Sequence, residues 1–531
     1  MAESMEQLEF ENENTWPKAL NAGEAEEFHQ KYETAVTAIR KQFGRRYQNI
    51  IDGKEVYSSG GEFEDRSPND TRIVLGRFQK STREDAAKAV EAAAKAFREW
   101  SQTDYQKRTS TLQRAADLFS ERKFELAAWM SFENGKNRFE AIGDVDEAID
   151  LTRYYCHTLN AEKGFDRPMG RVFPGETTRS ILKPYGVWGV VSPFNFPLAI
   201  ATGMTMGVIV TGNTAVFKPA SDTPLMGFKL YEALKDAGLP KGVFNYVTGP
   251  GSTVGEELVE NQTVKGIVFT GSKDVGFTAY KKFSEKVPRT FIAELGGKNP
   301  VIVTAKADVD KAVEGVFKAS FGYSGQKCSA ASRVYVDKSV KKQFIEKLVA
   351  KTKELKVGNS VEKDTFVGPV INEKAYKHFQ SYCETAFKDG KVLAGGHVTT
   401  EGDKKYGYYA EPTVIDGLAK NHRLFKEELF VPIVCVAEIE NLDEGLQLAN
   451  DVEYGLTAGI FTQDQAEAKK FLDEIEAGVI YVNRKVGATT GAMAGAQPFV
   501  GWKMSGTSGK GAGGPYYLQQ FLREQSQTVY P

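Results

Sequence analysis

The spacing of apolar residues divides the chain into a helical first part and a later part in which short apolar runs alternate with helical patterns. At residues 24–43 the apolar side chains recur every three or four positions, as one face of an amphipathic helix requires: Phe28, Tyr32, Ala35, Val36, Ile39 and Phe43. The spacing predicts another helix at 81–100, whose first four residues have the Ser-x-x-Glu form of a capping box. Further helical patterns lie around 108–126 and 140–160, and a strand is predicted at 71–79.

From residue 180 onward the pattern predicts a parallel sheet. Short β-rich runs alternate with helical patterns in the order 181–197, 213–219, 225–238, 242–249, 252–261 and 264–272. This alternation predicts βαβ units and a sheet covered on both faces. Ligands of such sheets bind beyond the carboxyl ends of the strands. The loops PFNFP, KPASDTP, GPGSTVG and FTGSKDVG are therefore expected to gather around one crevice.

The second half of the chain repeats this pattern and predicts a second α/β unit with a core of its own. Its expected strands and helices follow in the order 299–304, 332–337, 340–355, 411–415, 431–439, 455–461, 466–476 and 478–483. The tail after residue 514 is rich in aromatic and apolar residues and ends in a β-like stretch. A terminal strand of this kind can pair with the edge of another subunit, so the tail is a candidate oligomerisation arm.

Composition and charge restrict the class of function. A length of 531 residues exceeds one ordinary core, so two or three domains are expected. The net charge of -2 favours neither nucleic acid nor an acidic membrane surface, and no apolar run is long enough to cross a membrane. The acidic, polar N-terminus lacks the order of a secretory signal. Cys156, Cys328, Cys383 and Cys435 lie far apart without metal-ligand spacing, so a cytoplasmic protein without disulfides or a bound metal is expected.

Cys328 is the first candidate for chemistry. Small residues surround it in the stretch GYSGQKCSAASRV, where they leave room for a substrate and bring backbone N–H groups near the sulfur. A thiol becomes a nucleophile only as the thiolate, which needs partial exposure and nearby donors. The alternative is that Cys328 is a buried small hydrophobe, as many single cysteines are.

Two other motifs supply a candidate base and a candidate anion site. Glu294 ends the apolar run TFIAE before Leu295 and a Gly-Gly turn, where a carboxylate that opens into a crevice can act as a general base. In FTGSKDVG, Gly271 and Gly276 flank an expected helix N-terminus, whose free N–H groups can bind a phosphate. Taken singly, each motif is better explained by a solvent-facing glutamate and an ordinary glycine-rich turn.

In combination the motifs resemble the NAD(P)-dependent aldehyde dehydrogenase superfamily, from about residue 50 to the C-terminus. PFNFP, KPASDTP, FTGS, ELGGK, GQKC, EELFVP and PFVGWKMSG occur in the family's order. The resemblance implies an α/β fold with a Rossmann-type cofactor domain, an α/β catalytic domain and a small β arm for oligomerisation. The implied boundaries are an N-terminal helical segment at 1–46, a dinucleotide-binding domain at 47–166 and 185–293, a catalytic domain at 294–505, and the arm at 167–184 and 506–531.

The same resemblance implies the catalytic roles. Cys328 matches the nucleophile that attacks the aldehyde to give a thiohemiacetal. Asn195 matches the amide that forms the oxyanion hole together with the backbone N–H of Cys328. Glu294 matches the base that activates water to hydrolyse the acyl-enzyme. The residue types suit this chemistry, because a thiolate is a nucleophile and a good leaving group and an oxyanion needs fixed donors.

The resemblance also implies where NAD or NADP binds. The matching positions are Pro193, Lys218, Ser221, Gly251, Thr270, Gly271, Ser272, Leu295, Glu428 and Phe430. Lys218 matches the lysine that binds the adenosine ribose, Ser272 matches the pyrophosphate contact at a helix N-terminus, and the Leu295 carbonyl matches the acceptor for the nicotinamide amide.

Two departures from the family pattern affect these expectations. Ser221 replaces the glutamate that many NAD-preferring members carry. Without that carboxylate the site lacks repulsion against a 2′-phosphate, so NADP is expected to be accepted. Val431 and Val500 occupy positions that are usually glycine, so these loops either do not need φ > 0 or are shaped differently.

Two stretches, SGQKCSAASRV and the segment from GATTGAMAGAQPF to GAGGPYYL, resemble the 1-pyrroline-5-carboxylate dehydrogenases, which oxidise L-glutamate γ-semialdehyde to glutamate in proline catabolism. The resemblance implies that the Ser329 hydroxyl binds a substrate carboxylate and that Gly491 and Ala492 hold the α-amino acid end through backbone amides. Phe196 and Phe499 match the aromatic pair around the aliphatic middle. A loop rich in Gly and Ala, with free N–H groups, suits a carboxylate.

Other functions stay open at this point. Succinic or 2-oxoglutarate semialdehyde, each a short aldehyde with a carboxylate, is the alternative substrate. A CoA-acylating enzyme is disfavoured because such members often lack the base that Glu294 supplies. A catalytically inactive binding or structural relative is disfavoured by the presence of Cys328, Glu294 and Asn195 together.

Overall fold

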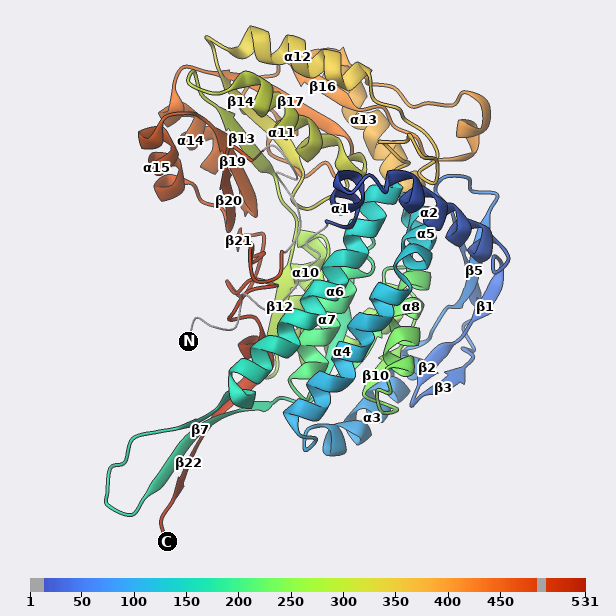
Figure 1. Ribbon diagram of the computed structural model, residues 1–531, viewed down its shortest axis with the longest axis vertical. Helices are drawn as coiled ribbons and strands as arrows, with labels where there is room; N and C mark the ends of the chain where they lie inside the picture. The colour runs from blue at the N-terminus through green and yellow to red at the C-terminus, as the bar shows by residue number, and fades with distance from the viewer. Residues whose placement is uncertain (1–13, 485–492) are drawn as a thin grey trace.

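The computed structural model describes residues 14–484 and 493–531, whose elements form two α/β units and a projecting arm (Figure 1). The first sheet has the order β12 (Thr290–Glu294), β11 (Val264–Thr270), β8 (Val187–Val191), β9 (Thr214–Lys218), β10 (Phe244–Tyr246), β2 (Asn49–Ile51) and β3 (Lys54–Val56). Strands β12 to β10 are parallel, and β2 and β3 extend the sheet antiparallel. The loops after β8, β9, β10 and β11 therefore leave the same edge of the sheet, as the sequence predicts.

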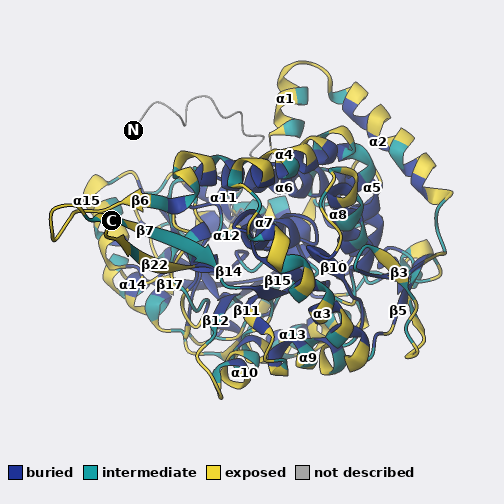
Figure 2. Ribbon diagram, turned by 90° about the horizontal axis from the view of Figure 1, so that it is seen from below, coloured by how far each residue is buried: buried dark blue, intermediate teal, exposed yellow. Residues whose placement is uncertain are grey.

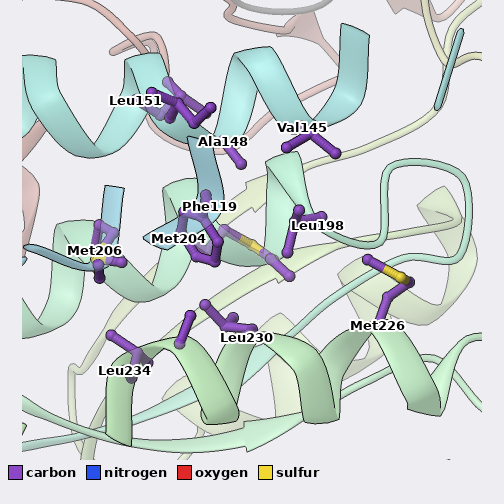
Figure 3. Packing of buried hydrophobic residues seen from close by; sticks show 14 of the residues in the cluster. Phe119, Val145, Ala148, Leu151, Leu198, Met204, Met206, Met226, Leu230 and Leu234 are labelled. Carbon is purple, nitrogen blue, oxygen red and sulfur yellow. The ribbon is translucent and has the colours of Figure 1, made fainter. Parts of the chain in front are cut away.

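Helices cover both faces of this sheet. On one face pack α3 (Arg83–Trp100), α9 (Glu256–Glu260) and α10 (Lys273–Ser284). On the other face pack α7 (Ala199–Val210) and α8 (Pro224–Asp236), and these two helices are in turn covered by α4 (Tyr105–Glu121), α5 (Lys123–Asn134) and α6 (Arg138–Ala161). Figure 3 shows α7 between α6 and α8, with Ala148, Met206 and Leu230 buried at the contacts. Burial of each large apolar side chain contributes about 1.5–3 kcal/mol.

The second sheet also has seven strands, in the order β15 (Lys391–Ala394), β16 (Thr413–Asp416), β17 (Ile433–Ile439), β14 (Ala331–Asp337), β13 (Asn299–Val303), β19 (Thr457–Phe461) and β20 (Val479–Val482). All neighbours are parallel except β15, which runs antiparallel to β16. The accompanying helices are α11 (Val309–Phe321), α12 (Lys341–Lys353), α13 (Glu373–Asp389), α14 (Leu442–Asn450) and α15 (Gln465–Glu474). Two separate apolar clusters cover the two faces, so this unit has a core of its own.

Smaller elements surround the two units. The N-terminal helices α1 (Thr15–Asn21) and α2 (Ala25–Arg40) precede a three-stranded sheet of β1 (Arg45–Tyr47), β5 (Val74–Gln79) and β4 (Glu62–Arg66). Helix α2 buries one face and exposes the other, as its spacing predicts (Figure 2). A short ribbon joins β18 (Tyr454–Gly455) to β21 (Trp502–Lys503).

The arm projects from the body beside the C-terminus (Figure 1). Its strands are β22 (Leu522–Val529), β7 (Thr177–Pro184) and β6 (Asp166–Pro168), with β22 antiparallel to β7 along its whole length. Among the residues that the structure describes, no helix has the length and apolar character needed to cross a bilayer.

Some local predictions differ from the observed structure. The capping box of α3 is formed by Thr82 and Asp85 rather than by Ser81, because the Ser81 hydroxyl is buried and accepts the Asn49 side-chain N–H at 2.8 Å. The pattern at 108–126 spans two helices, α4 and α5. Helix α7 was not indicated by any periodicity, because a helix that is apolar all round has no polar face to reveal its period.

Candidate active site

A cavity bounded by both α/β units brings together residues that are far apart in the sequence. About 660 Å³ of space there, including the part open to solvent, is not filled by atoms. Its lining includes six of the residues selected from the sequence: Phe196, Thr270, Glu294, Cys328, Ser329 and Phe499. Gly491 and Ala492, expected to hold the amino acid end of the substrate, lie outside the described residues.

Cys328 lies in the connection between α11 and β14, shortly after a strained turn. Tyr323 and Ser324 have φ of 48° and 55°, in the left-handed region that residues with a Cβ rarely adopt. The Tyr323 hydroxyl donates to the Asn134 carbonyl at 3.0 Å, and the Ser324 hydroxyl donates to the Gly368 carbonyl at 2.8 Å. These bonds to neighbouring loops hold the backbone in a conformation that costs about 1–2 kcal/mol per residue.

The surroundings of Cys328 keep its thiol protonated. Its carbonyl accepts the Asn299 side-chain N–H at 2.7 Å, and a Cβ on Gly297 would lie 2.5 Å from that carbonyl oxygen. The loop is therefore packed closely against the glycine turn that follows β12. Burial raises the pKa of the Cys328 thiol to about 12, with the nearby carboxylates of Glu428 and Glu294 adding to the effect. The thiol must therefore lose its proton before it can act as a nucleophile.

Glu294 is the last residue of β12 and faces the same cavity. Its Oε2 accepts the backbone N–H of Gly501 at 2.9 Å. Burial raises the pKa of the carboxyl well above its ordinary value, and the Gly501 bond opposes this only in part. A carboxyl group with a raised pKa suits general base catalysis near neutral pH. The position at a strand end, predicted from the sequence, is thus observed.

Asn195 and Phe196 follow β8 in the loop PFNFP. Asn195 is buried, and its carboxamide makes no hydrogen bond to another residue in the part of the chain that the structure describes. The preceding residue, Phe194, packs edge-on against Phe430 with 5.7 Å between ring centroids. Phe196 lines the cavity, whereas Asn195 lies beside it rather than in its wall. The Asn195 amide is therefore not bound by another residue of the described part of the chain.

The glycine positions replaced by valine do not need a left-handed backbone. In the neighbourhood of the two valines, φ is positive at Phe430 (57°) and at Lys503 (50°), but not at Val431 or Val500. The β-branched side chains therefore cause no backbone strain. Of the two explanations open from the sequence, the structure shows that these loops do not require glycine at the valine positions.

Several residues of the cavity wall carried no recognised signal in the sequence. Glu147 and Leu151 project from α6, Gly203 and Met204 from α7, and Tyr517 from the segment before β22. Glu147 is a carboxylate within a largely buried helix, which is the one feature that could have marked it. The others are apolar residues on buried elements, and only the tertiary structure places them at the cavity.

Comparison with known proteins gives a consistent result. The aldehyde dehydrogenase family pattern matches residues 56–527. The chain belongs to the aldehyde dehydrogenase family. It is 40% identical over 505 residues to the 1-pyrroline-5-carboxylate dehydrogenase of Geobacillus thermodenitrificans, a match that covers 94% of this chain and 96% of the relative. The resemblance, the α/β fold class and the enzyme class predicted from the sequence are confirmed.

Solved structures of aldehyde dehydrogenases show the same fold. The crystal structure of 1-pyrroline-5-carboxylate dehydrogenase from Thermus with bound NAD matches with a TM-score of 0.89 and 35% identity, over 94% of this chain and 96% of the other. The structure of betaine aldehyde dehydrogenase from Staphylococcus aureus in complex with NAD+ matches with a TM-score of 0.88 and 30% identity, over 94% and 97% of the chains.

The residues of this aldehyde dehydrogenase fit a dinucleotide. Lys218, at the end of β9, is buried, and within the described ranges 14–484 and 493–531 its Nζ donates to the Pro219 carbonyl alone, at 3.1 Å. Burial lowers the pKa of this ammonium to about 8. Ser272 is the N-cap of α10 and its side chain makes no capping bond, so the helix N-terminus can bind an anion. A Cβ on Gly251 would meet nothing within 4 Å, which leaves room beside the backbone.

Glu428, which the family resemblance places near the nicotinamide, has a carboxyl group held by the glycine turn after β12. Glu428 Oε1 accepts the Gly297 N–H at 2.9 Å. Burial raises the pKa of this carboxyl to about 7, and the nearby ammonium of Lys298 opposes the shift. Ser221 is exposed, next to Asp222, whose carboxylate accepts the Asn372 amide at 3.2 Å.

Proposed function

We propose that the protein oxidises L-glutamate γ-semialdehyde to L-glutamate in proline catabolism, with NAD or NADP as oxidant. The match to 1-pyrroline-5-carboxylate dehydrogenases over most of the chain supports this substrate. The observation that carries the substrate class is the position of Ser329. Ser329 lines the cavity next to Cys328, together with the rings of Phe196 and Phe499. A hydroxyl in that place distinguishes a carboxylate-bearing aldehyde from a purely apolar one.

The proposed mechanism follows from the described residues. The Cys328 sulfur, once deprotonated, attacks the aldehyde carbon and forms a thiohemiacetal. The Asn195 amide and the Cys328 N–H donate to the oxygen that becomes negative. A bound nicotinamide cofactor would supply the acceptor for the hydride of the former aldehyde carbon, which thereby becomes the carbonyl carbon of a thioester. Glu294 then removes a proton from water, the water oxygen adds to the thioester carbon, and Cys328 leaves as a thiolate while glutamate is released.

The cofactor positions follow the same proposal. The residues that would hold the dinucleotide are Pro193, Lys218, Ser221, Gly251, Thr270, Gly271, Ser272, Leu295, Glu428 and Phe430. Lys218 is a buried cation without a carboxylate within ion-pair distance among the described residues, which suits the ribose hydroxyls. The absence of a carboxylate at Ser221 favours acceptance of both NAD and NADP.

The organisation of the chain is part of the proposal. We infer the domain division stated above, with 47–166 and 185–293 binding the dinucleotide, 294–505 carrying the nucleophile, and the arm at 167–184 and 506–531 joining subunits into a homo-oligomer built on dimers. The separate cores of the two sheets support this division. The four cysteines are free thiols, which supports a reducing cytoplasm as the site of action.

The experiment that tests the function compares substrates by kcat/KM. We expect L-glutamate γ-semialdehyde to exceed succinic semialdehyde by at least about tenfold with either cofactor. Ser329→Ala is expected to raise the KM of glutamate γ-semialdehyde by about 10–100-fold, because a hydrogen bond to a charged group contributes about 1.5–3 kcal/mol. The KM of propionaldehyde, which has no carboxylate, should stay unchanged.

Two cysteine variants serve as controls for that assay. Cys328→Ala should abolish cofactor reduction with every aldehyde, whereas Cys383→Ala, at a buried thiol on α13, should retain it. Higher kcat/KM for succinic semialdehyde than for glutamate γ-semialdehyde would show that the substrate is wrong. Turnover by Cys328→Ala would show that the mechanism is wrong.

A further inference from the structure

Lys136 is a fully buried cation that none of the catalytic roles above uses. It lies in the short loop between α5 and α6. Its Nζ is 2.6 Å from Asp144 Oδ2, and both side chains are 0% exposed. Buried ion pairs contribute little net stability in general, because removing two charges from water offsets their attraction. The position of this pair is therefore more informative than its contribution to stability.

The pair contacts the loop that carries Asn195 at two points. The Lys136 Nζ lies 3.6 Å from the centroid of the Phe196 ring, which is a close cation–π contact. Asp144 Oδ1 accepts the backbone N–H of Ala199 at 2.6 Å, in the first turn of α7. One contact thus holds the residue immediately after Asn195, and the other holds the backbone where the loop enters the helix.

The loop that contains Lys136 also reaches the strained turn before Cys328. The Lys136 Nζ lies 5.1 Å from the centroid of the Tyr323 ring. Two residues earlier, the Asn134 carbonyl accepts the Tyr323 hydroxyl at 3.0 Å, and the Asn134 amide donates to the Phe194 carbonyl at 3.3 Å. This one loop therefore touches both the segment with the amide donor and the segment with the nucleophile, which belong to different α/β units.

We propose that Lys136 is a positioning residue: its ammonium, held by Asp144, fixes the Phe196 ring and with it the Asn195 amide relative to Cys328. The proposal rests on the proposed function of Asn195 and Cys328. A second cation, Lys327, lies farther from the Phe196 ring, at 6.0 Å. Lys136 is thus the cation that makes the close contact.

A double-mutant cycle tests the proposal. Lys136→Met keeps the length of the side chain and removes its charge. We expect it to lower kcat for L-glutamate γ-semialdehyde by about 10–100-fold, because small errors in position can cost that much, with KM changed by less than about threefold. Asn195→Ala should lower kcat by about 100–1,000-fold. The kcat of the double variant Lys136→Met/Asn195→Ala should lie within about twofold of the kcat of Asn195→Ala, because the group to be positioned is already absent.

Two further variants separate positioning from folding. Lys123→Met breaks a second buried pair, in which Lys123 Nζ on α5 lies 2.8 Å from Asp146 Oδ1 on α6, away from both loops. Each of the variants Lys123→Met and Lys136→Met leaves a buried carboxylate without its cation, so both should lower the thermal midpoint, but Lys123→Met should keep kcat within about twofold. The double variant Lys136→Met/Asp144→Asn leaves no lone buried charge, so it should fold and still show the reduced kcat.

Two results would overturn the proposal. One is a kcat of the double variant that is lowered by the product of the two factors by which Lys136→Met and Asn195→Ala each lower kcat. The other is a fall in kcat for Lys123→Met as large as that for Lys136→Met. Inactivity of the wild type toward glutamate γ-semialdehyde would instead overturn the proposed function. The same cycle would then be measured with the short-chain aldehyde that the wild type oxidises best.

Discussion

At the scale of single residues, burial changes the pKa values of the ionisable side chains in the cavity. Burial raises the pKa of the Cys328 thiol to about 12, and it raises the pKa of the Glu294 carboxyl well above its usual value. Burial thus shifts both groups toward their neutral forms. A carboxyl group with a raised pKa can take up and release a proton closer to neutral pH, whereas the thiol must lose its proton before it reacts.

Glu428→Gln should make Cys328 more reactive in the cofactor-free enzyme, because the Glu428 charge helps to raise the pKa of the thiol. The pKa of Glu428 is raised to about 7, so this carboxyl is mostly charged at pH 8 and mostly neutral at pH 6. We expect alkylation of Cys328 by iodoacetamide to be several-fold faster in the variant at pH 8, with a smaller difference at pH 6. If Glu428→Gln and the wild type were alkylated at the same rate at pH 8 as well as at pH 6, the electrostatic account would be contradicted. Exposed Glu440→Gln is the control.

At the scale of elements, the turn between α11 and Cys328 departs from the backbone that its residues prefer. Ser324 adopts φ of 55° although it has a Cβ, and its hydroxyl is bound to the Gly368 carbonyl at 2.8 Å. Such strain persists where the surrounding structure enforces it, and here it lies four residues before Cys328. The conformation of the turn is thus part of how Cys328 is presented to the cavity.

The order of stability of the glycine and alanine variants should therefore be opposite at two serines. At Ser324, Gly is expected to be more stable than Ala by about 0.5–1 kcal/mol, because relief of the left-handed strain exceeds the greater freedom of Gly in the unfolded chain. At Ser110, on the exposed face of α4, Ala should be more stable than Gly by about 1 kcal/mol. Thermal unfolding of the four variants measures both orders, and the same order at both serines would contradict the strain.

At the scale of the whole molecule, the arm is the part least covered by the rest of the chain. Strand β22 is the edge strand of its sheet, and Phe173, Val529 and Tyr530 are more than half exposed, at 62%, 63% and 68%. An exposed edge with apolar side chains is a site for pairing with another chain. This arrangement supports the proposed oligomer.

Deletion of residues 523–531 should reduce the size of the assembly, because it removes the edge strand that the proposal assigns to contacts between subunits. Light scattering coupled to size-exclusion chromatography would measure the mass. Phe387→Ser, which changes a half-exposed ring on α13 away from the arm, should leave the mass unchanged. An unaltered mass after the deletion would exclude the arm as an assembly element.

Much of the fold and of the site could be predicted because the signals are local. Alternating strands and helices, the loops at the ends of β8 to β11, and Glu294 at the end of β12 all depend on short stretches of sequence. Cys328 was distinguished from a buried small residue only by its motif partners. Their order along the chain carried that information, and the roles of the individual residues remain predictions.

The remainder depended on contacts between distant segments. The buried helix α7 has no polar face, and Glu147 reaches the cavity only because α6 packs across it. The pKa shifts of Glu294, Cys328 and Glu428 come from burial, which no short stretch of sequence encodes. Local periodicity determined the elements and their order. Only the tertiary structure placed Lys136 between the loop PFNFP and the turn before Cys328, because its contact with Tyr323 joins residues that are nearly two hundred positions apart.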